Sequence, residues 1–276
     1  MGGYEKIGQE YSRETKREYW DMAIGLQAVD NLQPSDYLKE LSEKNISGEI
    51  SNPEIERLIY RHYETEAVDK EDRTRESDLV SNRIVELLQM DAFTLSISTL
   101  KGIHRYLFRD LLEDAGNFRT YNISKKEMVL HGETVKYANY FMIEETLQYD
   151  LEQEKRHRYS RESEEETVAH LAKFTADIWQ VHPFPEGNTR TTAVFIERYL
   201  NTVGFQVDNT LFAEHAKYFR NALVRANYAN YREKIDVDMG FLGRFFENLL
   251  MGGNNLLRNR DMILGEKEKK RRPSGR

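Results

Sequence analysis

The hydrophobic positions of this chain recur mostly every three or four residues, a period that is typical of amphipathic helices. The clearest pair of helices lies in the second half, over residues 167–179 and 192–203, and Gly204 supplies a stop signal after the second. Between them runs a loop, residues 181–190, with two prolines, one glycine, a histidine, a carboxylate, an amide and a guanidinium. This loop is the first place to look for chemistry.

Similar spacing predicts further helices before and after this pair. They cover residues 19–32, 36–44, 53–62, 80–88, 100–111, 140–151, 210–226 and 239–251. One stretch differs, because two short apolar runs flank His131-Gly132-Glu133 within residues 128–138. A glycine at such a place suits a tight turn, so this stretch predicts a β-hairpin. The predicted fold class is all-α with one β-hairpin.

The polar segments suggest how the chain is divided. Residues 1–63 predict an N-terminal helical segment, and residues 64–77, almost all charged or polar, predict a linker or exposed loop. Residues 78–260 then form the predicted core domain. Residues 261–276 are predicted to be a tail, in which five of the six residues 267–272 are Lys or Arg. A disordered tail is favoured over an arm that binds nucleic acid.

Composition narrows the class of protein. The net charge of −7 disfavours general nucleic-acid binding, and the absence of cysteine excludes disulfides, thiolate metal sites and cysteine nucleophiles. No apolar run approaches the roughly 18 residues that cross a membrane. The first sixteen residues lack the apolar core of a signal peptide. We therefore expect a cytoplasmic protein without a membrane partner, and leave open export as an effector by another route.

The loop combines groups that suit phosphate chemistry. Its prolines end the first helix, and Gly187 and Asn188 open the second, where unpaired N–H groups and the helix dipole attract anions. Arg190 offers a fork of donors to phosphate, and Glu186 offers the single carboxylate that Mg²⁺ at phosphates often takes. His182 can accept a proton near neutral pH. Each residue alone has an ordinary structural use, but together they predict a phosphate site assisted by Mg²⁺, with a base beside it.

The same residues resemble a known signature. His-Pro-Phe-Pro-Glu-Gly-Asn-Thr-Arg, residues 182–190, is similar to the loop His-x-Phe-x-Asp/Glu-Gly-Asn-Gly-Arg-x-x-Arg of Fic-domain proteins. A second stretch, residues 100–125, also resembles the Fic core. Two positions depart from the pattern. Thr189 replaces its second glycine, and Ala193 stands where the family has the arginine that contacts the γ-phosphate.

The resemblance implies a largely helical protein adenylyltransferase, which moves AMP from ATP to a Tyr, Thr or Ser hydroxyl of a target protein, with ATP and Mg²⁺ as cofactors. It implies His182 as general base, Glu186 as Mg²⁺ ligand and Phe184 as the core anchor of the loop. The implied anion-hole and ATP-binding residues are Gly187, Asn188, Thr189 and Arg190.

Outer parts of the site follow from the same resemblance. The hairpin would be a flap that docks the target along Val135, Lys136 and Tyr137, and Asn227 and Tyr228 fall where relatives contact adenine. The N-terminal segment resembles the antitoxin-like modules found beside Fic domains. Their inhibitory motif has its nearest counterpart in residues 26–31, which makes Asp30 and Asn31 the regulatory candidates. Ala193 replaces the arginine that such a carboxylate would pair with.

Two other functions stay open from the sequence. One is a Doc-type phosphotransferase, which holds ATP in the reverse direction, although Doc-like loops usually have Lys at the position of Thr189. The other is a catalytically silent binding module. The loss of the second motif arginine, which Ala193 replaces, favours this alternative. Self-modification and the formation of homo-oligomers are both compatible with the sequence, which does not identify the target protein.

Overall fold

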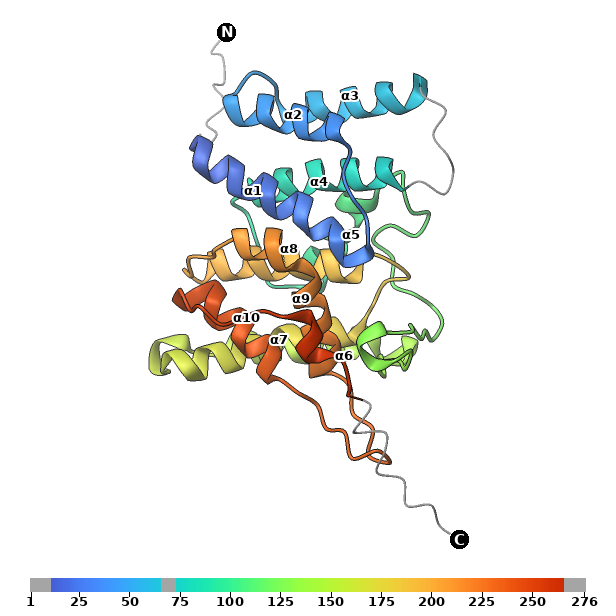
Figure 1. Ribbon diagram of the computed structural model, residues 1–276, viewed down its shortest axis with the longest axis vertical. Coiled ribbons are helices and arrows are strands. Elements are labelled where there is room, and N and C mark those ends of the chain that lie inside the picture. Colours follow the sequence, from blue (N-terminus) through green and yellow to red (C-terminus); the bar gives the residue numbers. More distant parts are fainter. Residues whose placement is uncertain (1–10, 66–72, 266–276) are drawn as a thin grey trace.

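The computed structural model describes residues 11–65 and 73–265. Within these ranges the chain forms ten α-helices, joined by loops and short 3-10 turns, and no β-strand. The helices are α1 (Arg13–Gly25), α2 (Asp36–Ser47), α3 (Asn52–Thr65), α4 (Thr74–Leu88), α5 (Ile97–Phe108), α6 (Ile143–Arg156), α7 (Glu164–Val181), α8 (Asn188–Thr202), α9 (Thr210–Ala226) and α10 (Gly240–Met251). Figure 1 shows them stacked in layers, with α2 and α3 at one end and α6 and α7 toward the other.

Serine side chains fix several helix starts. Ser35 accepts a hydrogen bond from the backbone N–H of Leu38 at the start of α2, the bond that makes serine a favoured N-cap. Ser163 and Glu166 form a reciprocal capping box at the start of α7. Each such cap satisfies backbone donors that a helix start otherwise leaves unpaired, and a cap of this kind stabilises a helix by about 1 kcal/mol.

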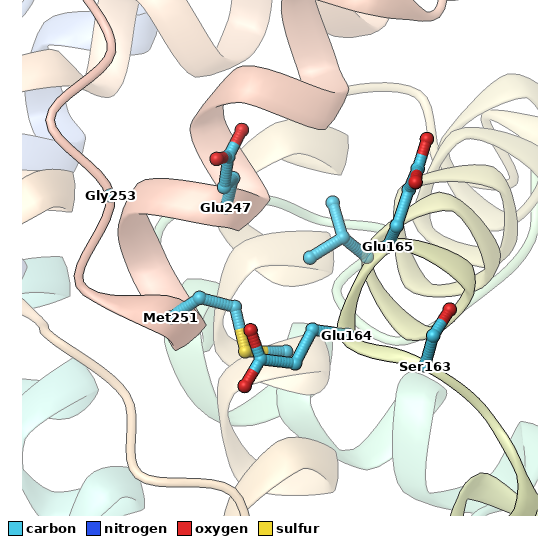
Figure 2. Close-up of a pocket in the computed structure, with 7 residues that line it drawn as sticks. Ser163, Glu164, Glu165, Glu247, Met251 and Gly253 are labelled. Carbon is cyan, nitrogen blue, oxygen red and sulfur yellow. The ribbon is translucent and has the colours of Figure 1, made fainter.

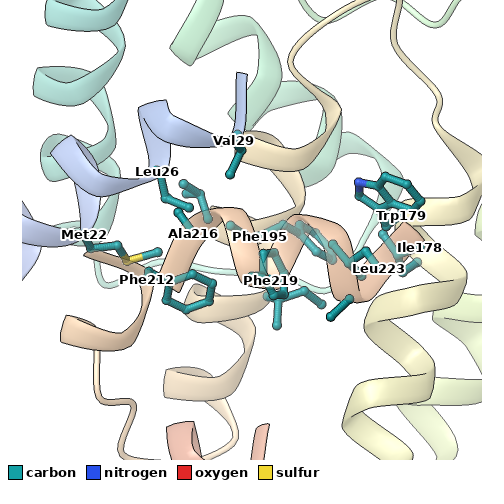
Figure 3. Close-up of a cluster of buried hydrophobic side chains, with 14 of the residues drawn as sticks. Met22, Leu26, Val29, Ile178, Trp179, Phe195, Phe212, Ala216, Phe219 and Leu223 are labelled. Atoms are coloured by element: carbon teal, nitrogen blue, oxygen red, sulfur yellow. The ribbon is translucent and has the colours of Figure 1, made fainter. Parts of the chain in front are cut away.

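The N-terminal helix shares its core with the second half of the chain. Helix α1 packs against α4 and α9. Met22 of α1 and Leu26, just after its end, lie against the face of α9 that carries Phe212, Ala216 and Phe219 (Figure 3). All of these side chains are buried. Burying each large apolar side chain is worth about 1.5–3 kcal/mol, so this contact holds the N-terminal segment firmly onto the body.

The prediction of a β-hairpin over residues 128–138 is wrong in its local structure. Met128–Leu130 forms the 3-10 turn η2, and the chain reverses through left-handed residues at His131 and Gly132. Backbone N–H groups of Glu127 and Gly132 donate to Glu133 and Glu127, but no strand ladder follows. The reason is visible in the burial, because adjacent Val129 and Leu130 are both buried, whereas a strand would send neighbours to opposite faces.

Two predicted boundaries also shift. The polar segment 64–77 does not end at residue 77, because Thr74 already begins α4 and Ser77 is buried. The predicted tail does not begin at residue 261, because Met262 and Leu264 are both buried. The predicted linker residues 66–72 and the basic stretch 267–272 lie outside the described residues. None of the described helices has the length and apolar character that crossing a membrane requires.

Helix α8 contains a buried acid, which gives a test of the fold. Glu197 is fully buried, and its Oε1 accepts from the side-chain amides of Asn201 at 2.7 Å and Asn209 at 3.3 Å. Its Oε2 and the Oδ1 of Asn209 have no hydrogen-bond partner among the described residues. Burial raises the pKa of Glu197 from 4.5 to about 7. A protonated carboxyl is the form that suits these surroundings.

Replacing Glu197 with glutamine should therefore stabilise the protein at pH 8. Between pH 4.5 and 7 the unfolded chain has released this proton while the folded chain keeps it, so wild-type stability falls as pH rises. Glutamine removes that loss, and we expect a gain of about 1–3 kcal/mol in the free energy of unfolding. Urea titrations at pH 4.5 and pH 8 check this, with the exposed Glu113→Gln as control. An equal effect at both pH values would contradict it.

Candidate active site

The predicted loop forms one wall of a cavity of about 300 Å³. The turn η1 (Leu26–Asp30) and the segment 123–125 supply the other walls. The lining residues are Asp30, Ile123, Ser124, Lys125, His182, Pro185, Glu186, Gly187, Asn188 and Thr189. A larger cavity of about 750 Å³ lies at the start of α7 and the end of α10, where three glutamates line it (Figure 2). That second cavity contains none of the predicted site residues.

His182 occupies a defined backbone position at the end of α7. It caps the helix in the left-handed region, with φ 48° and ψ 58°. Its ring Nδ1 lies 3.1 Å from the carbonyl oxygen of Trp179. A carbonyl only accepts, so Nδ1 carries the hydrogen and donates it. In the neutral ring, Nε2 is then left with its lone pair as a proton acceptor.

The surroundings of His182 keep the ring neutral. The ring of Tyr137 stacks on it at a centroid distance of 4.1 Å, and the residue is only 7% exposed. Burial, together with smaller contributions from the positive charges of Lys125, Arg220 and Arg119, lowers the pKa of His182 to about 3. At neutral pH the imidazole is therefore uncharged and ready to accept a proton at Nε2.

Arg119 holds the loop backbone in place, and sequence reasoning did not single it out. Its guanidinium donates to the carbonyl oxygens of His182 at 2.7 Å, Val181 at 3.1 Å, Tyr121 at 2.7 Å and Ala138 at 2.6 Å. Its own backbone N–H donates to the carbonyl of Pro183 at 2.9 Å. The stretch 100–125 that resembles the Fic core contains it, but nothing local marked its role.

Phe184 anchors the loop in the hydrophobic core. It is 1% exposed and stacks on His104 with 3.8 Å between ring centroids. The backbone N–H of Gly116 donates to His104 Nδ1 at 2.8 Å, so Nε2 carries the hydrogen and donates to the carbonyl of Glu186 at 3.1 Å. Burial lowers the pKa of His104 to about 4, which keeps this arrangement neutral. His104 is a core histidine, and it also positions the loop.

Two residues at the start of α8 use their side chains to close the loop. The amide of Asn188 accepts from the backbone N–H of Phe184 at 2.9 Å and donates to its carbonyl at 2.8 Å. Thr189, which replaces the glycine of the family pattern, accepts from the indole N–H of Trp179 at 2.9 Å. Gly187 caps the helix with φ 73°, a conformation that favours glycine. The anion-binding capacity of this turn therefore lies in its backbone.

Glu186 presents its carboxylate to the cavity. The side chain is 39% exposed, and its nearest cation, Arg73, lies 4.0 Å away. A half-exposed carboxylate beside a helix start fits a Mg²⁺ ion that also takes phosphate oxygens and waters. Glu186 is the residue that would hold such an ion here.

Arg190 is not on the cavity wall. It is fully buried, and it donates to the Oε1 atoms of Gln27 at 3.1 Å and Glu76 at 2.8 Å. Its Nε lies 2.9 Å from Asp30 Oδ2, although the two atoms are not aligned for a hydrogen bond. Burial acts to raise the pKa of Glu76, but bonds from Arg73 and Arg190 lower it on balance. The phosphate contact of Arg190 stays a prediction.

The remaining predicted residues fall in different places. Asn227 donates to the carbonyls of Ala176 and Leu223, and neither it nor the buried Tyr228 lines the cavity. Val135 is buried, and the carbonyl of Lys136 accepts from Gln180. Asn31 is an exposed left-handed cap of η1. Asp30, by contrast, lies at the cavity wall.

Comparison with known proteins identifies a family domain within the chain. Residues 94–200 match the Fic/DOC family. They form a Fic/DOC family domain. This Fic domain contains His182, Glu186 and the helix start at the cavity, as well as Arg119 and His104.

Curated relatives resemble only part of the chain. The probable protein adenylyltransferase y4lH of Sinorhizobium fredii is 28% identical over 138 residues, which is 48% of this chain and 65% of the relative. The protein adenylyltransferase VbhT of Bartonella schoenbuchensis is 27% identical over 165 residues, 54% of this chain and 33% of the relative. The chain therefore spans less than two thirds of each of these relatives.

The fold extends beyond the Fic domain. A solved FIC domain-containing signaling protein of Bacteroides thetaiotaomicron superimposes with a TM-score of 0.52 and 14% sequence identity. The match covers 85% of this chain and 84% of the other. It shows a common helical fold, in agreement with the all-helical architecture described above.

Proposed function

We propose that this chain is a protein adenylyltransferase that moves AMP from ATP to a Tyr, Thr or Ser hydroxyl of a target protein. The observation that carries the proposal is His182, a neutral imidazole that lines a cavity built on a helix start and whose Nδ1 is the nitrogen hydrogen-bonded to Trp179, which leaves Nε2 as the proton acceptor. Its position in a Fic domain, and the names of the two curated relatives, support this reaction over other phosphate chemistry.

The transfer needs one proton movement and one displacement at phosphorus. The target hydroxyl gives its proton to Nε2 of His182 while its oxygen forms a bond to the α-phosphorus. The bond from that phosphorus to the bridging oxygen of pyrophosphate breaks, and pyrophosphate leaves. The carbonyl of Trp179 accepts a hydrogen bond from the Nδ1–H group throughout, and this bond stabilises the imidazolium that forms. The backbone N–H groups that open α8, at Gly187 and Asn188, would bind the developing negative charge.

Nucleotide binding would also change the base. Burial and neighbouring positive charge hold the pKa of His182 near 3. Phosphates beside the ring offset that positive charge and favour the protonated form, so they raise the pKa toward the value that suits a general base. Mg²⁺ held by Glu186 would neutralise part of the phosphate charge when bound.

The segment after η2 is the proposed docking surface for the target. Tyr137 stacks on the base, which leaves the exposed residues 133, 134 and 136 as the part that faces solvent. An extended target segment can bind there through backbone hydrogen bonds, with little demand on its sequence.

Asp30 is the proposed regulatory residue. Its carboxylate lines the cavity and faces two cations, Arg190 at 2.9 Å and Lys125 at 3.8 Å. Its arginine partner is thus Arg190, and the fully buried Ala193 provides no charge. A carboxylate at this place opposes the binding of phosphates. Asn31, exposed and left-handed at the end of η1, would fix where the turn stops.

Labelling with ATP tests the proposal. We expect label from the α-phosphate, and none from the γ-phosphate, to appear on lysate proteins or on the chain itself when Mg²⁺ is present. Mass spectrometry should show an added AMP. Glu186→Gln should lower labelling strongly, whereas the exposed Glu113→Gln should not. Label from the γ-phosphate alone would replace the proposal by Doc-type phosphotransfer, and no label from either would favour a silent binding module.

A further inference from the structure

The cavity contains a single cationic side chain on its wall. Among the described residues that line it, only Lys125 is a lysine or arginine. Its side chain is 46% exposed, so the ammonium group can reach a ligand. A polyanion that enters this cavity therefore meets Lys125 as its first positive charge.

The neighbouring arginines already form ion pairs within the protein. Arg190 is 0% exposed and engages Gln27, Glu76 and Asp30. Arg73 forms a two-pronged bond with Glu76, each contact being 2.7 Å long. Moving either guanidinium into the cavity would leave buried or half-buried carboxylates without a partner, which costs several kcal/mol.

Lys125 itself is firmly positioned but loosely paired. Its backbone N–H donates to the hydroxyl of Thr134 at 3.0 Å, which ties it to the segment after η2. Its Nζ lies 3.8 Å from Asp30 Oδ1, too far for a hydrogen bond. Asp30 is in turn only 2.9 Å from Arg190, so its carboxylate keeps a closer partner if Lys125 turns away.

We infer that Lys125 is the phosphate-binding cation of this cavity, and that the polyphosphate tail of a nucleotide takes the place of Asp30 as its counter-ion. The inference rests on the proposed function for the choice of nucleotide. The anion would lie between the ammonium group and the backbone N–H groups that open α8, where Gly187 has no side chain in the way. Lys125 and His182 line the same cavity, and the charge of Lys125 contributes to the lowered pKa of His182.

The first experiment compares Lys125→Ala with Lys126→Ala, a neighbouring exposed lysine outside the cavity lining. Calorimetry measures the binding of ATP with Mg²⁺, and of inorganic tripolyphosphate. Loss of a charged contact to phosphate is expected to weaken binding of both ligands by about tenfold or more. Lys126→Ala should bind like the wild type. Equal affinities in the two variants would overturn the inference.

The second experiment tests the exchange of counter-ions. Asp30→Asn should strengthen tripolyphosphate binding by several-fold, since it removes a competing carboxylate, and the exposed Asp36→Asn should not. The gain should vanish when Lys125 is also alanine. A gain that persists in the double variant would mean that Arg190 is the released cation, and would overturn the exchange at Lys125. Circular dichroism spectra that match the wild type establish that each variant is folded.

The outcomes separate this inference from the proposed function. Tripolyphosphate binding that depends on Lys125, without any AMP transfer, would support the anion site and refute the transferase. Conversely, the wild type could transfer AMP while Lys125→Ala binds nucleotide and labels targets equally well. That result would support the transferase and refute the role of Lys125.

Discussion

Replacing His182 with alanine is expected to lower the rate of AMP transfer by about two to four orders of magnitude, the usual contribution of a general base. The ring is neutral, and its Nδ1–H group donates a hydrogen bond to the carbonyl of Trp179. Its Nε2 is therefore the proton acceptor that the target hydroxyl requires. Binding of ATP with Mg²⁺ should change little, because the imidazole acts on the hydroxyl and not on the phosphates. The loss should therefore appear in the rate of the bound complex.

The control for this variant is His215→Ala. His215 lies on α9 outside the cavity, and its side chain is 32% exposed. Initial rates of labelling by α-labelled ATP, measured with saturating nucleotide, should match the wild type for this control. Thermal unfolding of both variants checks that they are folded. Labelling by His182→Ala at the wild-type rate would exclude the histidine as the base.

Replacing Gly187 with alanine should destabilise the protein by about 2–4 kcal/mol, because two penalties add. The backbone at Gly187 has φ +73°, which an L-residue adopts at a cost. A Cβ there would also lie 2.3 Å from Cε2 and 2.4 Å from Cζ of Phe108. The ring cannot move aside easily, since Phe108 is fully buried and Arg190 and His104 each lie 4.8 Å from its centroid.

Gly204→Ala isolates the steric part of this effect. Gly204 has a similar backbone, with φ +92°, but a Cβ there would meet nothing within 4 Å. It should cost about 1 kcal/mol, the backbone penalty alone. Urea unfolding gives both free energies, and Gly187→Ala should lose more by at least 1 kcal/mol. If the two losses were equal, the contact with Phe108 would contribute nothing to the requirement for glycine.

Local patterns in the sequence predicted much of what surrounds the loop. The period of the apolar residues predicted most of the helices, and the prolines and Gly187 predicted the turn between α7 and α8. The helix predicted over residues 36–44 begins beside Ser35, whose hydroxyl satisfies a backbone donor three residues on. These features depend on groups a few residues apart, which a sequence shows directly.

Contacts between distant segments were beyond local patterns. The flap was predicted as a hairpin, yet Val129 and Leu130 both turn inward because the body of the protein offers a surface for both. The guanidinium of Arg119 donates to the carbonyl of nearby Tyr121 and to three carbonyls from two distant segments, those of Ala138, Val181 and His182. Such a hub has no signature in its own neighbourhood.

The sequence by itself determined which chemical groups the loop offers: an imidazole at His182, a carboxylate at Glu186 and a helix start that attracts anions. These follow from residue type and from spacing along one chain segment. Only the tertiary structure decided which charges face the cavity. It buries Arg190 against Asp30 and Glu76, and it brings Lys125 to the wall. The physical reason is that burial and ion pairing depend on segments far apart in the chain, which meet only when the helices pack.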